Sequence, residues 1–200
     1  MFDISSGCSL SLEALHFVDG RGDDGGAVRA VGAGDIAMKD VTFTGCEATK
    51  YGGGMFVYNS GDVALEGASF SECTAAQRGG GMRVRLYSSG DVALDGASFS
   101  ECTAPDGGGM HVWYSGDVSL ERASFVRCTS GVQAALYLLM PLERLALANS
   151  QFVGYRAPSS HQLAVCRQHR ERNPCCTLLR LQRRCLRLDP PQHDLLRQLC

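Results

Sequence analysis

The 200-residue sequence is poor in lysine and has no long hydrophobic run. Lys39 and Lys50 are its only lysines and the net charge is −2. Nucleic-acid binding needs clustered basic residues, so no nucleic-acid partner is expected. The longest apolar run, residues 134–140, is far shorter than the ~20 residues of a membrane-spanning helix, so no transmembrane helix is expected. No secretion signal is visible at the start.

A second set of absences divides the chain near residue 155. All 24 glycines and all 8 phenylalanines lie in residues 1–154. Residues 161–200 contain eight Arg and five Cys, but no Gly, Lys or aromatic residue. The charge divides as well, being −7 over residues 1–160 and +5 over residues 161–200. We therefore expect a domain at residues 1–157 and a distinct Arg/Cys/Leu-rich tail at residues 158–200.

The first domain is an internal repeat. The segment GDVALEGASFSECTA at residues 61–75 returns almost unchanged at 90–104 and more loosely at 34–48 and 116–130. Apolar and polar residues alternate within each copy, which is typical of β-strands. A single copy has no partner for its apolar face, so stacking of copies is needed for stability. This pattern predicts an all-β, three-sided parallel β-helix (solenoid) of about five to six coils. A globular α/β fold is the competing interpretation, but it requires helical periods that residues 30–155 lack.

The repeat resembles a known one. Phe99-Ser-Glu-Cys-Thr-Ala104 and Gly107-Gly-Gly-Met110 are similar to F-x-x-N-x-A and G-G-A-I of the polymorphic outer membrane protein repeat, which belongs to the pectin-lyase-like right-handed β-helix superfamily. The match covers about residues 15–155, with Cys where that repeat usually has Asn. The resemblance implies a right-handed β-helix in an extracellular or cell-surface protein with an adhesive or structural role.

Stacked coils would place equivalent inward side chains in columns. The predicted structural ladder contains Phe43, Phe70, Phe99 and Phe125, together with Cys46, Cys73, Cys102 and Cys128. In-register Cβ vectors suit a disulfide poorly. We therefore expect free buried thiols that pack as small hydrophobic groups, with metal or redox chemistry as the alternative.

The strand after each glycine patch is expected to point every second residue outward. One outward column contains Phe56, Arg83 and His111, and its neighbour contains Tyr58, Arg85 and Trp113. Exposed aromatic rings can stack on sugars or on a partner surface, and Arg adds hydrogen bonds. These six residues are the predicted ligand-binding stripe, and its expected partner is a glycan or another surface protein. The alternative is that aromatic residues simply suit strands.

A row of aspartates follows the glycine that opens each coil. Its members are Asp35, Asp62, Asp91 and Asp117. Stacked carboxylates repel one another, and bound Ca²⁺ would relieve that repulsion. A solvated acidic edge, with Asp placed by turn chemistry, is the preferred interpretation. No metal and no cofactor are therefore expected, with this calcium edge as the alternative.

The sequence predicts no catalytic residues. Enzymes of the resembled superfamily carry Asp, Lys or Arg in a cleft walled by long loops, whereas the turns here are short. His111 beside Asp91 or Asp117 is the one candidate acid–base pair. We expect a non-enzymatic β-solenoid segment of a surface or extracellular protein, acting as a rigid scaffold or an adhesive face. The alternative is a fragment of a carbohydrate-active β-helix enzyme whose catalytic coils lie outside these residues.

The tail allows several interpretations. Cys166, His169, Cys175, Cys176 and Cys185 could bind zinc, but two clean ligand pairs are absent. The segment from Leu178 to Leu188 could form an amphipathic helix that caps the solenoid. The tail could equally be a disordered segment or a frame-shifted continuation of the repeat. Oligomeric state is not predicted.

Overall fold

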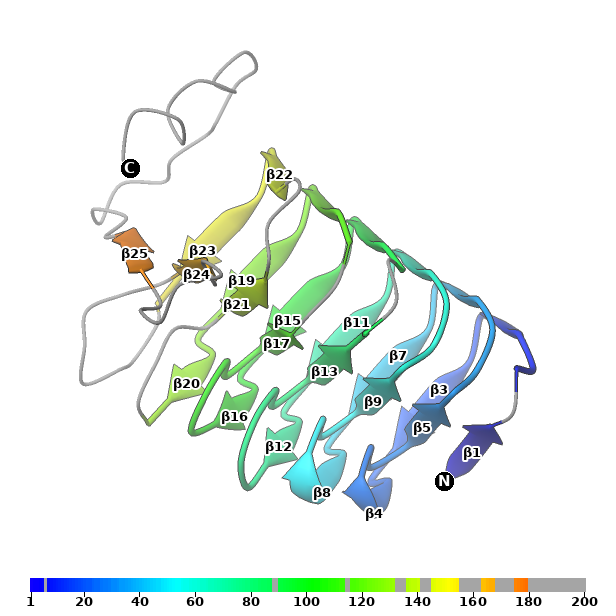
Figure 1. Cartoon of the computed structure of the whole chain (residues 1–200). Helices are drawn as coiled ribbons and strands as arrows, with labels where there is room; N and C mark the ends of the chain where they lie inside the picture. The colour runs from blue at the N-terminus through cyan, green and yellow to red at the C-terminus, as the bar shows by residue number, and fades with distance from the viewer. Residues whose placement is uncertain are drawn as a thin grey trace.

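The computed structural model describes residues 1–5, 7–87, 90–113, 116–131, 136–140, 145–154, 163–167 and 175–179. The described residues form β-strands and turns, and none of them lies in a helix. Coils follow one another along a single axis from the N-terminal to the C-terminal end (Figure 1). Within this part of the chain, no helix is long and apolar enough to span a bilayer.

Three sheets enclose the core, each formed by equivalent strands of successive coils. Sheet A contains β1 (Phe2–Ser5), β5 (Val28–Val31), β9 (Met55–Tyr58), β13 (Met82–Arg85), β17 (Met110–Trp113) and β21 (Leu136–Met140). Sheet B contains β2 (Leu10–Glu13), β6 (Ile36–Lys39), β10 (Val63–Glu66), β14 (Val92–Asp95), β18 (Val118–Glu121) and β22 (Leu145–Ala148). Sheet C contains β3 (His16–Val18), β7 (Thr42–Thr44), β11 (Ser69–Ser71), β15 (Ser98–Ser100), β19 (Ser124–Val126) and β23 (Gln151–Val153). The predicted all-β parallel solenoid is thus confirmed.

A fourth, short sheet was not predicted. Sheet D contains β4 (Arg21–Asp24), β8 (Glu47–Tyr51), β12 (Thr74–Ala75), β16 (Thr103–Ala104) and β20 (Thr129–Ser130). Its strands form a row along one edge of the molecule (Figure 1). Its buried alanines, Ala48, Ala75 and Ala104, form a cluster separate from the main core. Sheet D and the turn that follows it therefore form an arm beside the solenoid, and we call it the arm below.

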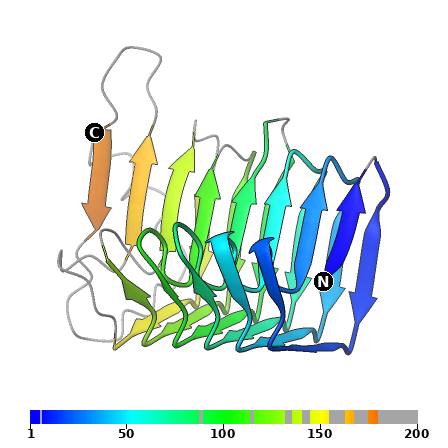
Figure 2. The same ribbon diagram turned by 90° about the horizontal axis from the view of Figure 1, so that it is seen from below.

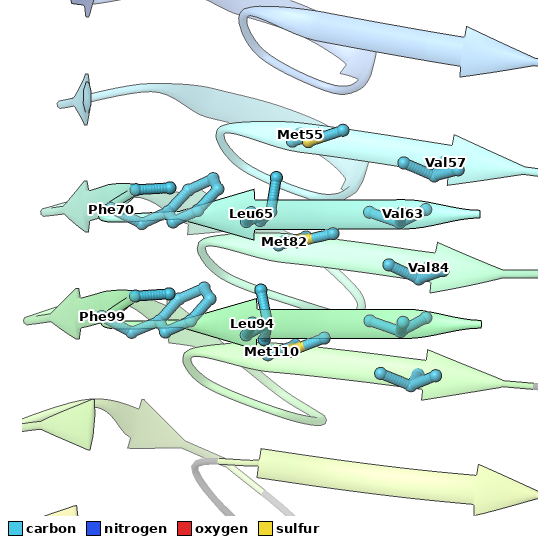
Figure 3. Packing of buried hydrophobic residues seen from close by; sticks show 14 of the residues in the cluster. Met55, Val57, Val63, Leu65, Phe70, Met82, Val84, Leu94, Phe99 and Met110 are labelled. Atoms are coloured by element: carbon cyan, nitrogen blue, oxygen red, sulfur yellow. The ribbon is translucent and has the colours of Figure 1, made fainter. Parts of the chain in front are cut away.

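The register places equivalent residues of successive coils side by side. Phe70 pairs with Phe43 on one side and Phe99 on the other. The ring centroids of these neighbours are 4.5 and 4.8 Å apart, and each pair of planes is within 3° of parallel. Columns of methionine, leucine and valine pack beside this stack (Figure 3). The apolar positions of the repeat thus become one continuous core.

Single residues in the left-handed region make two corners of each coil. Gly67 (φ 61°) turns the chain from sheet B to sheet C, and Glu72 (φ 56°) turns it toward sheet D. A corner of one residue cannot vary in length. The distance in sequence from the first residue of the sheet B strand to the paired Thr of sheet D is therefore the same, 11 residues, in three coils: Val63 to Thr74, Val92 to Thr103 and Val118 to Thr129.

Glycine lets the arm fold closely against the next coil. A Cβ at Gly80 would overlap the carbonyl oxygen of Gly108 and would lie 2.6 Å from the amide nitrogen of Thr103. Gly79, with φ of 66°, starts this return toward sheet A. The glycine patch of the repeat therefore exists because backbone meets backbone at this point.

Sheet A continues beyond the last regular coil. β24 (Leu163–Arg167) adds to β21 in parallel, and β25 (Cys175–Leu179) adds to β24 in antiparallel orientation. Figure 2 shows β25, in orange, pointing opposite to its neighbours. The first two residues of the helix predicted at 178–188 thus belong to a strand, and the remainder lies outside the described residues. The domain boundary at residue 157 stays a prediction.

Candidate functional site

The predicted stripe lies on the outer face of sheet A, but half of it is covered. Tyr58, Arg85 and Trp113 are partly exposed. Phe56, Arg83 and His111 retain only 6, 2 and 1% of their accessible surface. These three side chains alternate with inward-facing residues, as predicted. Their predicted exposure is nevertheless wrong, because the arm lies over that part of the sheet.

The arm contributes its own ladder of side chains to this cover. Tyr51, Arg78 and Asp106 occupy equivalent positions and are joined by parallel bridges. The guanidinium carbon of Arg83 lies 3.6 Å from the centre of the Tyr51 ring. The ring of Phe56 lies 6.0 Å from that of Tyr51. The first column is therefore packed between sheet A and the arm.

The second column surrounds an arginine with aromatic rings. The guanidinium carbon of Arg85 lies 4.7 Å from the ring centres of both Tyr87 and Trp113, and 5.6 Å from that of Tyr58. Tyr87 is 52% exposed and opens this group to solvent. We define the aromatic–arginine cluster as the side chains of both columns with their neighbours: Tyr51, Phe56, Tyr58, Arg78, Arg83, Arg85, Tyr87, His111, Trp113 and Tyr137.

Positive charge in the aromatic–arginine cluster is only partly balanced. Nε of Arg78 lies 3.3 Å from Oδ2 of Asp106. No carboxylate of the described residues pairs with the guanidinium of Arg83 or Arg85. Their Nε atoms are buried and have no hydrogen-bond partner there. Burial lowers the pKa of Arg83, and the charge of Arg78 lowers it further, but arginine remains protonated.

His111 is buried among these cations. Burial holds its pKa well below 6.5, and the charges of Arg83, Arg78 and Arg85 lower it further. Its ring lies 4.9 Å from that of Tyr137, and its buried Nδ1 has no hydrogen-bond partner among the described residues. His111 is therefore neutral at pH 7. The acid–base pair predicted with Asp91 or Asp117 is not formed through Nδ1.

The cysteine column lies inside the solenoid. Cys46, Cys73, Cys102 and Cys128 are all buried and free. Each thiol contacts the carbonyl oxygen of a residue in the preceding coil, such as Cys102 with Phe70 at 3.4 Å. Contact with the thiols of Cys128 and Cys73, together with burial, raises the pKa of Cys102. The column therefore packs the core and offers no accessible nucleophile.

The aspartate row is a ladder of hydrogen bonds between coils. The backbone amide of Asp62 donates to Oδ1 of Asp35 at 3.1 Å. Asp91 donates to Asp62 at 2.9 Å, and Asp117 donates to Asp91 at 2.8 Å. Each of the first three carboxylates therefore accepts a backbone hydrogen bond from the following coil, and the calcium edge stays an untested alternative. Within the described ranges, no group of three or more His, Cys, Asp or Glu side chains could hold a metal.

The outer face of sheet B forms a shallow groove of about 470 Å³. A column of small side chains forms its floor: Ser11, Ala37, Ala64, Ala93 and Ser119. Charged residues flank this floor, and several are paired, such as Lys39 with Glu66 at 3.7 Å. The groove lacks the aromatic groups and unpaired cations of the sheet A cluster. We therefore take the sheet A cluster as the candidate site.

Sequence reasoning missed Tyr51, Arg78, Asp106 and Tyr87. The first three have a shared signal, because each directly precedes a glycine patch. Aligning the repeats on the glycines would have grouped them in one column. Tyr87 lies in the turn after β13, where the coils differ in length, so no equivalent position identifies it.

Comparison with known proteins gives a family. The family model of the right-handed beta helix region matches residues 26–152. No curated protein and no solved structure matches the chain. The resemblance to polymorphic outer membrane protein repeats and to pectin lyases therefore stays a prediction. The stacked coils agree with this match, and the chain therefore belongs to the right-handed β-helix family.

Proposed function

We propose that this solenoid is a rigid, non-enzymatic scaffold that binds a glycan through the aromatic–arginine cluster. The observation that carries the proposal is the half-exposed group of Tyr58, Tyr87 and Trp113 around Arg85. Flat rings beside a hydrogen-bond donor suit the apolar face and hydroxyl groups of a sugar. The surface or extracellular location is part of the proposal and rests on the repeat resemblance alone.

The chemistry of the cluster supports binding rather than catalysis. Its histidine is buried, and the adjacent carboxylate of Asp106 is paired with Arg78. General acid–base catalysis needs a group within reach of the substrate, and these two groups are occupied or covered. The family match alone does not distinguish a scaffold from an enzyme, so turnover has to be measured.

A glycan array tests the proposal. The wild-type chain should bind a subset of glycans, and the Tyr58→Ala, Trp113→Ala double variant should lose at least about tenfold in affinity, since each aromatic contact contributes about 1 kcal/mol. Phe2→Ala is the matched control, because Phe2 is exposed and lies outside the cluster. Binding unchanged in the double variant would remove the cluster from consideration.

An enzyme assay tests whether this chain is itself catalytic. The same chain is incubated with polygalacturonate and with neutral polysaccharides, and new reducing ends and unsaturated products are measured. We expect no turnover. Cleavage by this chain would instead support the carbohydrate-active enzyme, with its catalytic groups within these residues.

A further inference from the structure

The unpaired arginines of the cluster specify its ligand more closely, an inference that rests on the proposed function. Arg83 is 98% buried, and the described residues around it are aromatic rings, with the Tyr51 side chain as a hydrogen-bond partner, other cations and neutral His111, but no carboxylate. Arg85 lies two residues further along the same strand, on the same face. A buried charge without a counter-ion is costly, and an opposite charge offsets that cost.

We infer that the aromatic–arginine cluster binds an anionic glycan, whose carboxylate or sulfate group pairs with Arg85 in the positive field of Arg83. Guanidinium is well suited to both anions because it donates two parallel hydrogen bonds. The rings of Tyr87 and Trp113, each 4.7 Å from the Arg85 guanidinium carbon, add aromatic surface for the sugar, and Arg78 lies 5.5 Å from the Trp113 ring.

The surroundings of the cluster sharpen this inference. Residues 1–160 carry a net charge of −7, so the positive cluster stands on an acidic body. Such a body repels long polyanions, whereas a single anionic group can reach the local cations. Two guanidinium groups can also make far fewer phosphate contacts than nucleic-acid binding requires. A glycan with spaced charges fits better than a nucleic acid.

Tyr51 controls how closely an anion approaches Arg83. Its ring lies 3.6 Å from the Arg83 guanidinium carbon, and Arg83 itself is 2% exposed. The anion therefore contacts Arg85 directly and senses Arg83 through the low-dielectric packing between them. For this reason both arginines should contribute to affinity, with Arg85 contributing more.

The single tryptophan provides the measurement. Trp113 is the only Trp in the chain, so its fluorescence reports on the cluster alone. Three hexasaccharides serve as probes: one sulfated, one with carboxylates only, and one neutral. We expect at least one anionic probe to bind about tenfold or more tightly than the neutral probe, with affinity falling as salt is added. The two anionic probes distinguish sulfate from carboxylate recognition.

Variants separate charge from packing. Arg85→Met should weaken the anionic probe about tenfold or more, and Arg83→Met should weaken it several-fold, while the neutral probe is unaffected. Arg85→Lys should recover part of the loss. Arg122→Met is the matched control because it removes one cation from the corner between sheets B and C, where Arg122 pairs with Asp95 and Glu121. Cooperative thermal unfolding, with a midpoint no lower than that of the wild type, establishes that the variants are folded.

Failure of this inference and failure of the proposed function differ. Equal binding of neutral and anionic probes, unchanged in both arginine variants, would overturn the anionic preference and leave glycan binding intact. No binding of any probe, together with a blank glycan array, would overturn both. Equal binding of a single-stranded oligonucleotide of matched charge would also overturn the inference, because the cluster would then recognise charge without sugar.

Discussion

The two faces of sheet A differ in how far their residues repeat from coil to coil. The inward column repeats one residue, with Met55, Met82 and Met110 side by side. The next residue of each strand points outward, and there the column changes at every coil: Phe56, Arg83 and His111. Repetition suits a core because identical side chains stack in register. The outward column does not repeat, and its residues belong to the proposed binding site.

The largest expected effect is on the repeating side. Phe70→Ala removes a ring stacked on both neighbours and should lower the free energy of unfolding by about 3 to 5 kcal/mol. Phe152→Ala should cost less, because Phe152 stacks on Phe125 and is only partly buried. Chemical denaturation of both variants measures this. Equal losses would contradict the view that each ring is supported by two neighbours.

The second largest effect on stability is expected in the arm, which covers the outward column of sheet A. Gly80→Ala places a methyl group against the backbone of Gly108 and Thr103, and such overpacking costs about 1 to 3 kcal/mol. Displacement of the arm should also expose the cluster and shift Trp113 emission to the red. Gly131→Ala is the control, because a Cβ there meets only Pro105 at 3.6 Å. Similar losses in the two variants would mean that the close approach at Gly80 is unimportant.

In the outward column, which varies from coil to coil, a substitution is expected to stabilise the protein. Arg83→Met keeps an unbranched side chain and removes a buried, unpaired charge, so the free energy of unfolding should rise by about 1 to 2 kcal/mol. The exposed control Arg122→Met should change stability by less than about 1 kcal/mol. A destabilised Arg83→Met variant would show instead that the guanidinium contact with Tyr51 is a packing contact that outweighs the cost of burial.

The smallest effect depends on pH. The pKa of His111 in the folded state lies well below 6.5, so below pH 6.5 the unfolded chain binds a proton that the folded chain does not. Stability should therefore fall as pH decreases from about 6.5, by at most about 1.4 kcal/mol per pH unit for this group. His111→Phe should remove that part of the pH dependence, and His16→Phe, at an exposed position, should not. An unchanged slope in His111→Phe would mean that other groups determine it.

The sequence predicted the core well because the core is the repeat. Phe43, Phe70 and the cysteines recur at fixed places, so alternation and spacing were enough to place them inside and in register. The burial of Arg83 could not be predicted in the same way. Its cover includes Tyr51, which belongs to the arm of the preceding coil. Alternation along a strand predicts which face a residue occupies, but it does not predict what lies above that face.

Sheet D shows a second limit of pattern reasoning. Its strand in the middle coils has only two residues, as in Thr74–Ala75, which is too short for a period to be detected. The glycine patch beside it is visible in the sequence, but its spacing does not show what it packs against. Its real constraint, backbone packed against the backbone of the next coil, depends on a neighbour about one coil away in sequence. Such a contact exists only after the coils have stacked.

The one-residue corners determine where this solenoid can accept new sequence. From sheet B through sheet C to sheet D the number of residues is the same in every coil, so a residue inserted there would turn the side chains that follow it to the wrong face.

All differences in coil length therefore fall in the two connections that border sheet A. One returns from the arm, taking eight residues from Thr74 to Met82 but seven from Thr103 to Met110. The other leaves sheet A, taking eight residues from Met55 to Val63 but ten from Met82 to Val92. Both connections flank the aromatic–arginine cluster, so insertions there can change the shape of its rims while the register of the core stays as it is.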